Sequence, residues 1–237
     1  MPILDLIAED SEHSGKSNTF LNHHSYLVHK RRGTKLERFD SIRVDGIAMV
    51  WLLRLFGASV SRRSFDYTSI ADEVFRAAEL EGSAVFVVGS LPAHVESFVF
   101  KLAEKYPRIM IIGAESGHFS TDLARDNCIS KIVCLRPDLL IVGMGAPLQE
   151  QFLIDVMDRG WCGTSYTCGG FIHQTAEKGA EYYPAIFNAL NLRWLYRILD
   201  EPRLWRRYLL HYPIATLYMA MEAISLRVRD SGRRARN

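Results

Sequence analysis

The chain has 237 residues, and 48% of them are hydrophobic, which is enough to bury a substantial core. This composition excludes a disordered tail and fits one α/β domain with an appendage, or two small domains. The net charge of +2 is too small to indicate a nucleic-acid-binding protein, although arginines gather toward the C-terminus.

Residues 1–17 are polar and acidic without sustained periodicity, so we expect a loose lead-in outside the core. The acidic residues in this stretch also argue against a signal peptide, and we therefore expect a cytoplasmic protein. The cysteines contain no Cys-x-x-Cys pair, which favours buried, reduced thiols over a disulfide or a zinc site. They are Cys128, Cys134, Cys162 and Cys168.

Asn22, His23 and His24 come before the first strand that the pattern predicts, on a segment expected to be extended. Adjacent histidines on an extended segment point to opposite sides and do not easily share one ion. No other His, Asp or Glu pair of zinc-like spacing is expected. We therefore predict chemistry that needs no metal.

A short strand is predicted at residues 41–44, and it runs into Asp45 and Gly46 before a helix over 47–56. Asp45 is thereby placed at the carboxyl end of a strand, with little side-chain bulk around its carboxylate. It could accept a proton from a hydroxyl as a general base, or it could be the N-cap of the helix that follows.

From residue 68 onward, predicted helices and strands alternate. The helices are expected over 68–80, 92–105, 120–127 and 147–157, and the strands over 84–88, 109–112, 139–142 and 162–167. This alternation predicts an α/β fold with a Rossmann-like, doubly wound, mostly parallel sheet. Glycine-bearing loops that follow the strands should meet at the carboxyl edge of the sheet, which is where such folds bind ligands.

The most informative stretch is residues 137–150, where an apolar strand stops abruptly at Gly143 and Gly145. Glycines let the backbone approach a ligand closely, and the first turn of the next helix favours an anion such as a diphosphate. Gln149 could donate to that ligand or to a sugar hydroxyl. Alternatively, Gln149 is a solvated amide and Glu150 only complements the helix dipole. The stretch lacks the glycine spacing of a dinucleotide site and the ending of a P-loop.

Aromatic residues and arginines interleave from residue 191 onward, after a glycine pair at 169–170. A helical hairpin packed on the core would explain the aromatics but not the arginines. Arg203, Arg206 and Arg207 fall within about one helical turn, a cluster that suits anionic headgroups or a diphosphate at a membrane surface. A nucleic-acid surface is the less favoured alternative. The apolar run at 212–226 is too short and too polar for a bilayer span.

Three ordered motifs together resemble the WecG/TagA/CpsF family of bacterial glycosyltransferases, which is glycosyltransferase family 26. The similarity extends from about residue 22 to residue 208. The motifs are Val44-Asp45-Gly46, the Gly-x-Gly-x-Pro-x-Gln-Glu signature at Gly143 through Glu150, and the pair formed by Trp194-Leu195-Tyr196-Arg197 and Glu201 through Tyr208.

The resemblance implies an inverting transferase, without metal or cofactor, that moves a sugar from a UDP-sugar to a polyprenyl-diphosphate-linked saccharide. Such an enzyme would act in exopolysaccharide or cell-wall polymer synthesis at the inner face of the membrane, with Asp45 as the base. The implied donor-binding residues are Asn22, Gly143, Gly145, Pro147, Gln149, Glu150, Gly169 and Gly170. The implied acceptor- or diphosphate-binding residues are Arg62, Arg63, Arg203, Arg206 and Arg207.

The sequence departs from the family pattern in two places. The usual Arg-x-x-Gly-x-Asp is matched only loosely at 62–66, which leaves open whether Arg62 or Arg63 contacts ligand. The usual Arg-Ala-Pro is replaced by Tyr182-Tyr183-Pro184. Both places are expected to contact sugar or phosphate, so glucose, N-acetylmannosamine and related uronic acids all stay open as the transferred sugar.

We expect three parts: the lead-in at 1–17, a catalytic domain at 18–190, and a helical, membrane-associating appendage at 191–237. The resemblance implies that an exposed apolar edge near the appendage would favour self-association, and the sequence leaves the oligomeric state open. One alternative function is a catalytically silent nucleotide-binding module that is recruited to a membrane surface. A Rossmann-type oxidoreductase is disfavoured by the missing glycine fingerprint.

Overall fold

The computed structural model describes residues 2–7, 16–179, 187, 193–200 and 204–234, with the side chains of residues 193 and 227–234 left aside. Within this part of the chain, six parallel strands form one sheet in the order β2-β1-β6-β5-β3-β4. The strands are β1 (Ser17–Leu21), β2 (Ser41–Val44), β3 (Ala84–Gly89), β4 (Met110–Glu115), β5 (Leu139–Gly143) and β6 (Thr164–Thr167). The predicted doubly wound α/β fold is confirmed.

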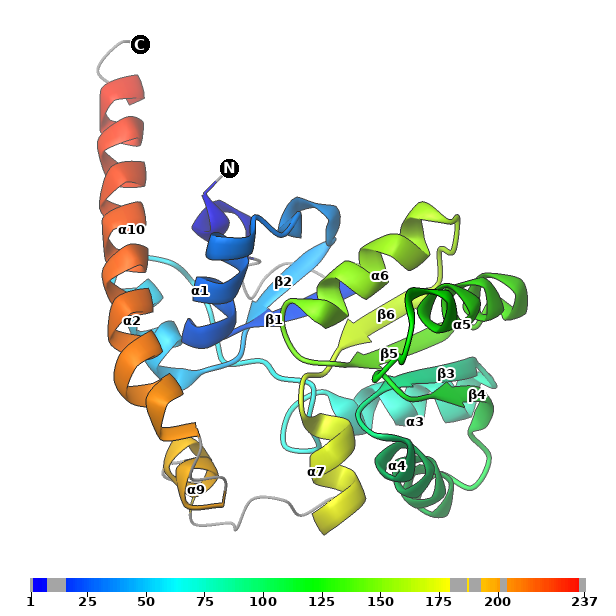
Figure 1. Cartoon of the computed structure of the whole chain (residues 1–237). Helices are drawn as coiled ribbons and strands as arrows, with labels where there is room; N and C mark the ends of the chain where they lie inside the picture. The colour runs from blue at the N-terminus through cyan, green and yellow to red at the C-terminus, as the bar shows by residue number, and fades with distance from the viewer. Residues whose placement is uncertain (1, 8–15, 180–186, 188–192, 201–203, 235–237) are drawn as a thin grey trace.

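Helices cover both faces of this sheet (Figure 1). One face packs against α1 (His23–Arg32), α2 (Ile47–Leu55), α5 (Asp122–Leu135) and α6 (Leu148–Asp158). The other face packs against α3 (Ala71–Glu81), α4 (Pro92–Lys105) and α7 (Phe171–Lys178). The sheet thus has two cores, the first on the α1, α2, α5 and α6 side and the second on the α3, α4 and α7 side. Successive strand residues point to opposite faces, so Leu140 and Val142 enter the first core while Leu139 and Ile141 enter the second.

The strand β1 and the helix α1 were not predicted, and they change the setting of Asn22 and its neighbours. Asn22 follows β1 rather than preceding the first strand, and its side chain caps α1 by accepting from the backbone amides of His24 and Ser25. His23 and His24 are therefore helical, and the expectation of an extended segment was wrong. The helix signal was a capping box, Asn22 with Ser25 three residues later.

The N-terminal residues differ from the expected loose lead-in where they are described. The short 3₁₀ turn η1 (Ile3–Leu6) packs its side chains against the first core, and Ile7 forms a bridge with Ile42 of β2. A second 3₁₀ turn, η2 (Leu36–Arg38), precedes β2. Four apolar residues at 3–7 are enough to anchor this short segment to the sheet edge.

The C-terminal segment forms α9 (Arg193–Asp200), a π-helical turn η4 (Arg207–His211) and the long helix α10 (Tyr212–Arg234). Figure 1 shows α10 running beside α1 and extending past the core. Glu222 of α10 is buried, accepts a hydrogen bond from the Tyr26 hydroxyl of α1 and lies 3.5 Å from Lys30 Nζ. Ala215 and Met219 belong to the first core, so α10 is packed on the domain. Among the described helices, none has the length and hydropathy needed to span a membrane.

Candidate active site

A cavity of about 740 Å³ opens at the carboxyl ends of β1, β2, β5 and β6, and the C-terminal segment forms part of its wall. This is the sheet edge at which the sequence predicts a cleft. The predicted site residues that line it are Asn22, Asp45, Arg62, Gly145, Gln149, Gly169, Gly170 and Arg207. Gly143, Pro147, Glu150, Arg63 and Arg206 do not line it, and Arg203 lies outside the described residues.

Asp45 directly follows β2, and its backbone amide donates to the Leu21 carbonyl at 2.7 Å, which continues the ladder between β1 and β2. Gly46, not Asp45, is the N-cap of α2, and no side chain caps that helix end. The Asp45 carboxylate is 38% exposed beside the cavity. Its carboxylate is thus placed to meet a ligand rather than to cap a helix.

Arg62 and Arg63 take different directions, although they are adjacent in the sequence. The Arg62 guanidinium lies 3.6 Å from Asp45 Oδ1, donates to Ser64 Oγ and lines the cavity. Arg63 lines a separate hollow near the amino ends of the strands, while its backbone amide donates to the Val44 carbonyl. Of the two arginines, only Arg62 is positioned to reach a ligand beside Asp45.

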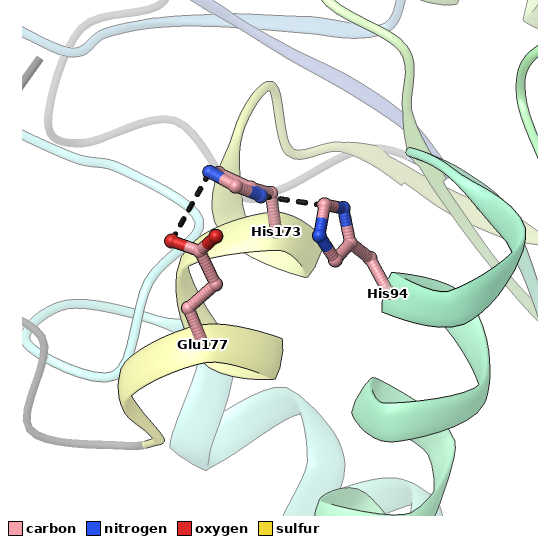
Figure 2. A group of neighbouring side chains, drawn as sticks. All are labelled: His94, His173 and Glu177. Carbon is pink, nitrogen blue, oxygen red and sulfur yellow. Dashed lines mark hydrogen bonds and ion pairs between the residues drawn. The ribbon is translucent and has the colours of Figure 1, made fainter.

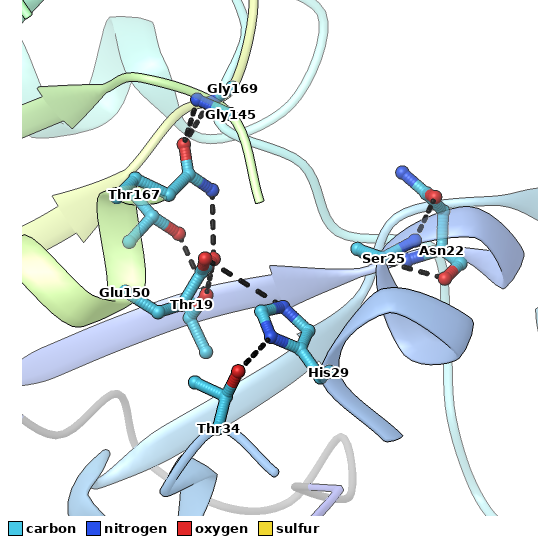
Figure 3. A network of polar contacts seen from close by, with 10 residues as sticks. Thr19, Asn22, Ser25, His29, Thr34, Gly145, Glu150, Thr167 and Gly169 are labelled. Atoms are coloured by element: carbon cyan, nitrogen blue, oxygen red, sulfur yellow. Dashed lines mark hydrogen bonds and ion pairs between the residues drawn. The ribbon is translucent and has the colours of Figure 1, made fainter. Parts of the chain in front are cut away.

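Gln149 is buried and holds two glycine turns together. Its Oε1 accepts from the backbone amide of Gly145 at 3.2 Å and from that of Gly169 at 3.0 Å, while Nε2 donates to Glu150 at 2.8 Å. Figure 3 shows the two glycine amides converging above this network. These contacts rule out a solvated amide, because Gln149 is buried and each end of its side-chain amide has a protein partner.

Glu150 is fully buried beneath the same turns and does not reach the cavity. Its Oε1 accepts from Thr19 as well as from Gln149, and Thr19 in turn contacts Thr167 of β6 (Figure 3). Burial raises the pKa of the Glu150 carboxyl, and burial lowers the pKa of the neighbouring His29 imidazole to about 4. The Glu150 Oε2 and His29 Nε2 atoms lie 3.7 Å apart. Glu150 therefore holds Gln149 in place from the interior of the protein.

Gly143 and Pro147 shape the loop without lining the cavity. An added Cβ at Gly143 would lie 2.8 Å from Cys168 Sγ and 3.1 Å from the Gly169 carbonyl, so only glycine lets β5 approach the next turn this closely. Pro147 is the N-cap of α6. Gly145 has a φ of +75°, a left-handed conformation that favours glycine, and its amide points toward Gln149.

The C-terminal segment supplies side chains that the sequence did not single out as ligand contacts. Arg197, Tyr208 and Tyr212 all line the cavity. Arg197 Nη2 would lie 3.7 Å from a Cβ added to Gly170, which places this guanidinium beside the N-terminal end of α7. The signal for Arg197 was its place in the Trp-Leu-Tyr-Arg motif.

Arg207 links this segment to the first helix. Its Nη2 donates to Asn22 Oδ1 at 3.0 Å, and its Nε is buried without a hydrogen-bond partner among the described residues. Arg206, by contrast, is exposed and lies over the ring of Trp205. Arg207 is thus the arginine of the expected cluster that the structure brings to the cavity.

The four cysteines differ in their burial. Cys128 is buried and Cys168 is partly buried, whereas Cys134 and Cys162 are exposed, so the prediction of buried thiols was wrong for the latter two. All four are free. Cys168 lies next to the Gly169 turn, and burial raises the pKa of its thiol.

The sequence matches the model of the Glycosyl transferase WecG/TagA/CpsF family over residues 3–229. The chain belongs to this family. The match covers nearly the whole chain, including the lead-in, the sheet and most of α10, so the resemblance of the three motifs is confirmed.

Curated relatives in this family are named as transferases that act on lipid-linked sugars. The chain is 34% identical over 196 residues to a UDP-Gal:alpha-D-GlcNAc-diphosphoundecaprenol beta-1,4-galactosyltransferase of Shigella boydii, covering 82% of this chain and 81% of the relative. It is 29% identical over 140 residues to an N-acetylglucosaminyldiphosphoundecaprenol N-acetyl-beta-D-mannosaminyltransferase of Staphylococcus aureus, covering 58% and 52%. The chain is therefore similar to glycosyltransferases whose named acceptor is undecaprenyl-diphosphate-linked N-acetylglucosamine.

Proposed function

We propose that this WecG/TagA/CpsF family member transfers a sugar from a UDP-sugar to a polyprenyl-diphosphate-linked saccharide, with inversion and with Asp45 as the general base. The observation that carries the proposal is the accessible Asp45 carboxylate beside a cavity that the Gly145 and Gly169 turns and Arg207 also line. The named acceptors of the relatives supply the chemical class of the acceptor.

The proposed reaction is a direct displacement. The Asp45 carboxylate takes the proton of the acceptor hydroxyl while the hydroxyl oxygen bonds to the anomeric carbon of the donor sugar. The bond from that carbon to the β-phosphate oxygen breaks, and UDP leaves with the electron pair. A single displacement inverts the anomeric carbon, which agrees with the β linkages in the names of both relatives.

Positive groups in the cavity are suited to stabilise the departing diphosphate. The N-terminal end of α7, with the positive end of its dipole, lies at the Gly169–Gly170 turn, and this turn, Arg197 and Arg207 all line the cavity. Guanidinium groups bind phosphate oxygens through paired hydrogen bonds. With this positive charge in place, we propose that transfer needs no metal ion.

The C-terminal helix is suited to rest on a membrane that carries the lipid acceptor. Ile214, Leu217, Tyr218, Met221 and Ile224 recur at helical spacing on α10, and all are exposed. Leu209 and Leu210 extend this apolar surface at η4, while Arg206 is exposed nearby. An amphipathic helix with basic residues at its edge binds anionic bilayer surfaces. We therefore propose peripheral attachment to the cytoplasmic face.

The test is a UDP-release assay with a short-chain lipid-diphosphate N-acetylglucosamine acceptor and a panel of UDP-sugars, run in EDTA. Asp45→Asn is expected to lower kcat by about 100-fold or more while UDP binding, measured by calorimetry, stays within about twofold. Asp122→Asn, an exposed carboxylate on α5, is the matched control and should leave both unchanged.

Two results would overturn the proposal. UDP release that is unchanged in Asp45→Asn would remove the aspartate from the chemistry. UDP binding without turnover of any donor, in the presence of the acceptor, would favour the catalytically silent nucleotide-binding module instead.

A further inference from the structure

Two histidines and a glutamate meet between α4 and α7, outside the cavity described above. His173 and Glu177 are one turn apart on α7, and His173 Nε2 lies 3.4 Å from Glu177 Oε2. His94, on the first turn of α4, brings its Nδ1 to 3.3 Å from His173 Nδ1. Figure 2 shows the two imidazoles and the carboxylate turned toward one another across the two helices.

This cluster is held in place by other contacts between the same helices. Ser97 and Lys101 follow His94 at three and seven positions, and thus lie on the same face of α4. Ser97 Oγ donates to the Ala176 carbonyl at 3.1 Å, and Lys101 Nζ donates to the same carbonyl at 2.7 Å and to the Thr175 carbonyl at 3.2 Å. The register of α7 on α4 is therefore fixed independently of the histidines.

The atoms of the cluster have the chemistry and the spacing of a transition-metal site. One nitrogen from each imidazole and one carboxylate oxygen lie within 4.8 Å of one another. Ligand atoms at a tetrahedral zinc are separated by roughly 3.3 Å, given bonds of about 2.0 Å, so the three side chains would have to rotate toward one ion, with one of the two His173 nitrogens as its ligand. Two imidazoles and one carboxylate are a common ligand set for zinc that leaves a fourth position for water.

We propose that His94, His173 and Glu177 bind one Zn²⁺ ion that ties α7 to α4. The expectation that the chain has no zinc-like pair was wrong, because His173 and Glu177 have the i, i+4 spacing that puts two ligands on one helix face. His94 completes the set from 79 residues upstream, a separation that spacing alone does not reveal.

The ion would act on the position of α7 rather than in sugar transfer. Gly170 is the N-cap of α7 and Gln174 lies on it, and both residues line the cavity, whereas none of the three ligands does. Tying α7 to α4 would thus stiffen the turn at the N-terminal end of α7. This proposal does not depend on the proposed transferase activity.

The experiment uses the full chain after removal of metals with EDTA and subsequent removal of the chelator. Titration with ZnCl₂ in a calorimeter is expected to give one ion per chain. Thermal unfolding is expected to show a higher midpoint with Zn²⁺ than without it. Co²⁺ added in place of Zn²⁺ should give the visible absorption of a site with nitrogen and oxygen ligands. His173→Gln and His94→Gln are each expected to weaken Zn²⁺ binding at least tenfold.

Matched variants make the outcome specific to this cluster. His118→Gln removes an exposed histidine and Glu96→Gln removes an exposed carboxylate on α4, and both should bind Zn²⁺ as the unaltered chain does. No Zn²⁺ binding by the unaltered chain would overturn the proposal. Equal binding by His173→Gln, or a thiolate charge-transfer band with Co²⁺, would also overturn it by placing the ion elsewhere.

Discussion

The Asp45 carboxylate and the Arg62 guanidinium lie 3.6 Å apart beside the same cavity, and Arg62 is mostly buried. This relationship separates Arg62 from its neighbour Arg63, which the sequence pattern could not do. We predict that Arg62→Gln lowers kcat/KM by about 10- to 100-fold, because a hydrogen bond to a charged group contributes about 1.5–3 kcal/mol. Steady-state UDP-release kinetics measures this loss. Arg63→Gln should change kcat/KM less than threefold, and equal losses in the two variants would contradict the assignment.

Gln149 is predicted to matter for stability and for ligand binding together. Gln149→Glu removes the donor to Glu150 and brings a second acidic group beside a buried carboxyl, so the free energy of unfolding should fall by about 1–3 kcal/mol or more. Repulsion between the two carboxyl groups should displace the side-chain oxygen that accepts from the Gly145 and Gly169 amides, so UDP affinity should fall as well. Urea unfolding and calorimetry measure the two effects. Gln151→Glu, which is exposed on the same helix, is the control. A Gln149→Glu variant as stable as the unaltered chain would contradict the prediction.

Acid should destabilise the packing of α1. Burial lowers the pKa of His23, His24 and His29 to about 4, with Arg207 and His211 adding to the effect at His24. In the unfolded chain these imidazoles bind protons below their ordinary pKa of 6.5, whereas in the folded chain they do so only near pH 4. The free energy of unfolding is therefore unaffected by these groups above pH 6.5, and it falls as the pH drops from 6.5 toward 4. The raised pKa of Glu150 opposes this trend, since its protonated form is favoured in the folded chain.

Urea midpoints at several pH values between 7.5 and 4.5 measure this acid sensitivity. Each histidine contributes up to about 1.4 kcal/mol per pH unit to the slope. His24→Gln should therefore flatten the profile, whereas His118→Gln should not, because His118 is exposed. A profile that is flat between pH 6.5 and 4.5 in the unaltered chain would contradict the prediction.

The exposed apolar face of α10 should govern vesicle binding without governing folding. Leu217 and Met221 are 63% and 58% exposed, so replacing both with glutamate removes apolar surface that the fold does not bury. We expect at least tenfold weaker binding to vesicles that contain anionic lipid, since burying one such side chain contributes about 1.5–3 kcal/mol. Sedimentation with vesicles measures this loss of binding. Arg108→Glu, at an exposed position between α4 and β4, lowers the net charge by the same two units away from α10 and is the control.

The sequence predicted those helices and strands whose spacing of apolar residues is typical of a helix or a buried strand. The buried strands β3 and β5 and the helix α4 are close to their expected bounds, whereas α5 ends at Leu135 rather than at residue 127. The strand β1 was missed because three of its five residues, Ser17, Asn18 and Thr19, are polar yet buried. Asn18 donates to the Ser165 carbonyl and Thr19 to Glu150, so long-range hydrogen bonds replace the apolar signal.

The location of the site was predictable from the sequence, but the contacts of each side chain were less so. Asp45 and the glycine turns were placed correctly at the sheet edge, because the position after a parallel strand follows from topology. Gln149 and Glu150 were expected to contact ligand, but Glu150 is buried away from the cavity, and Gln149, at the cavity wall, is already bonded to protein groups. Their partners, Thr19 and the amide of Gly169, come from distant strands that no local spacing indicates. The cavity contact of Arg197 depends likewise on how α9 packs.

The order of the strands has a consequence for the synthesis of this protein. Among the described strands, β1 and β2 are hydrogen-bonded to the rest of the sheet only through β6, which pairs with β1 on one side and β5 on the other. A ribosome that has not yet released residues 164–167 therefore holds two unjoined fragments of sheet. Asp45 belongs to the first fragment and Gly145 to the second, so the two sides of the candidate site stay apart until translation has passed the last strand.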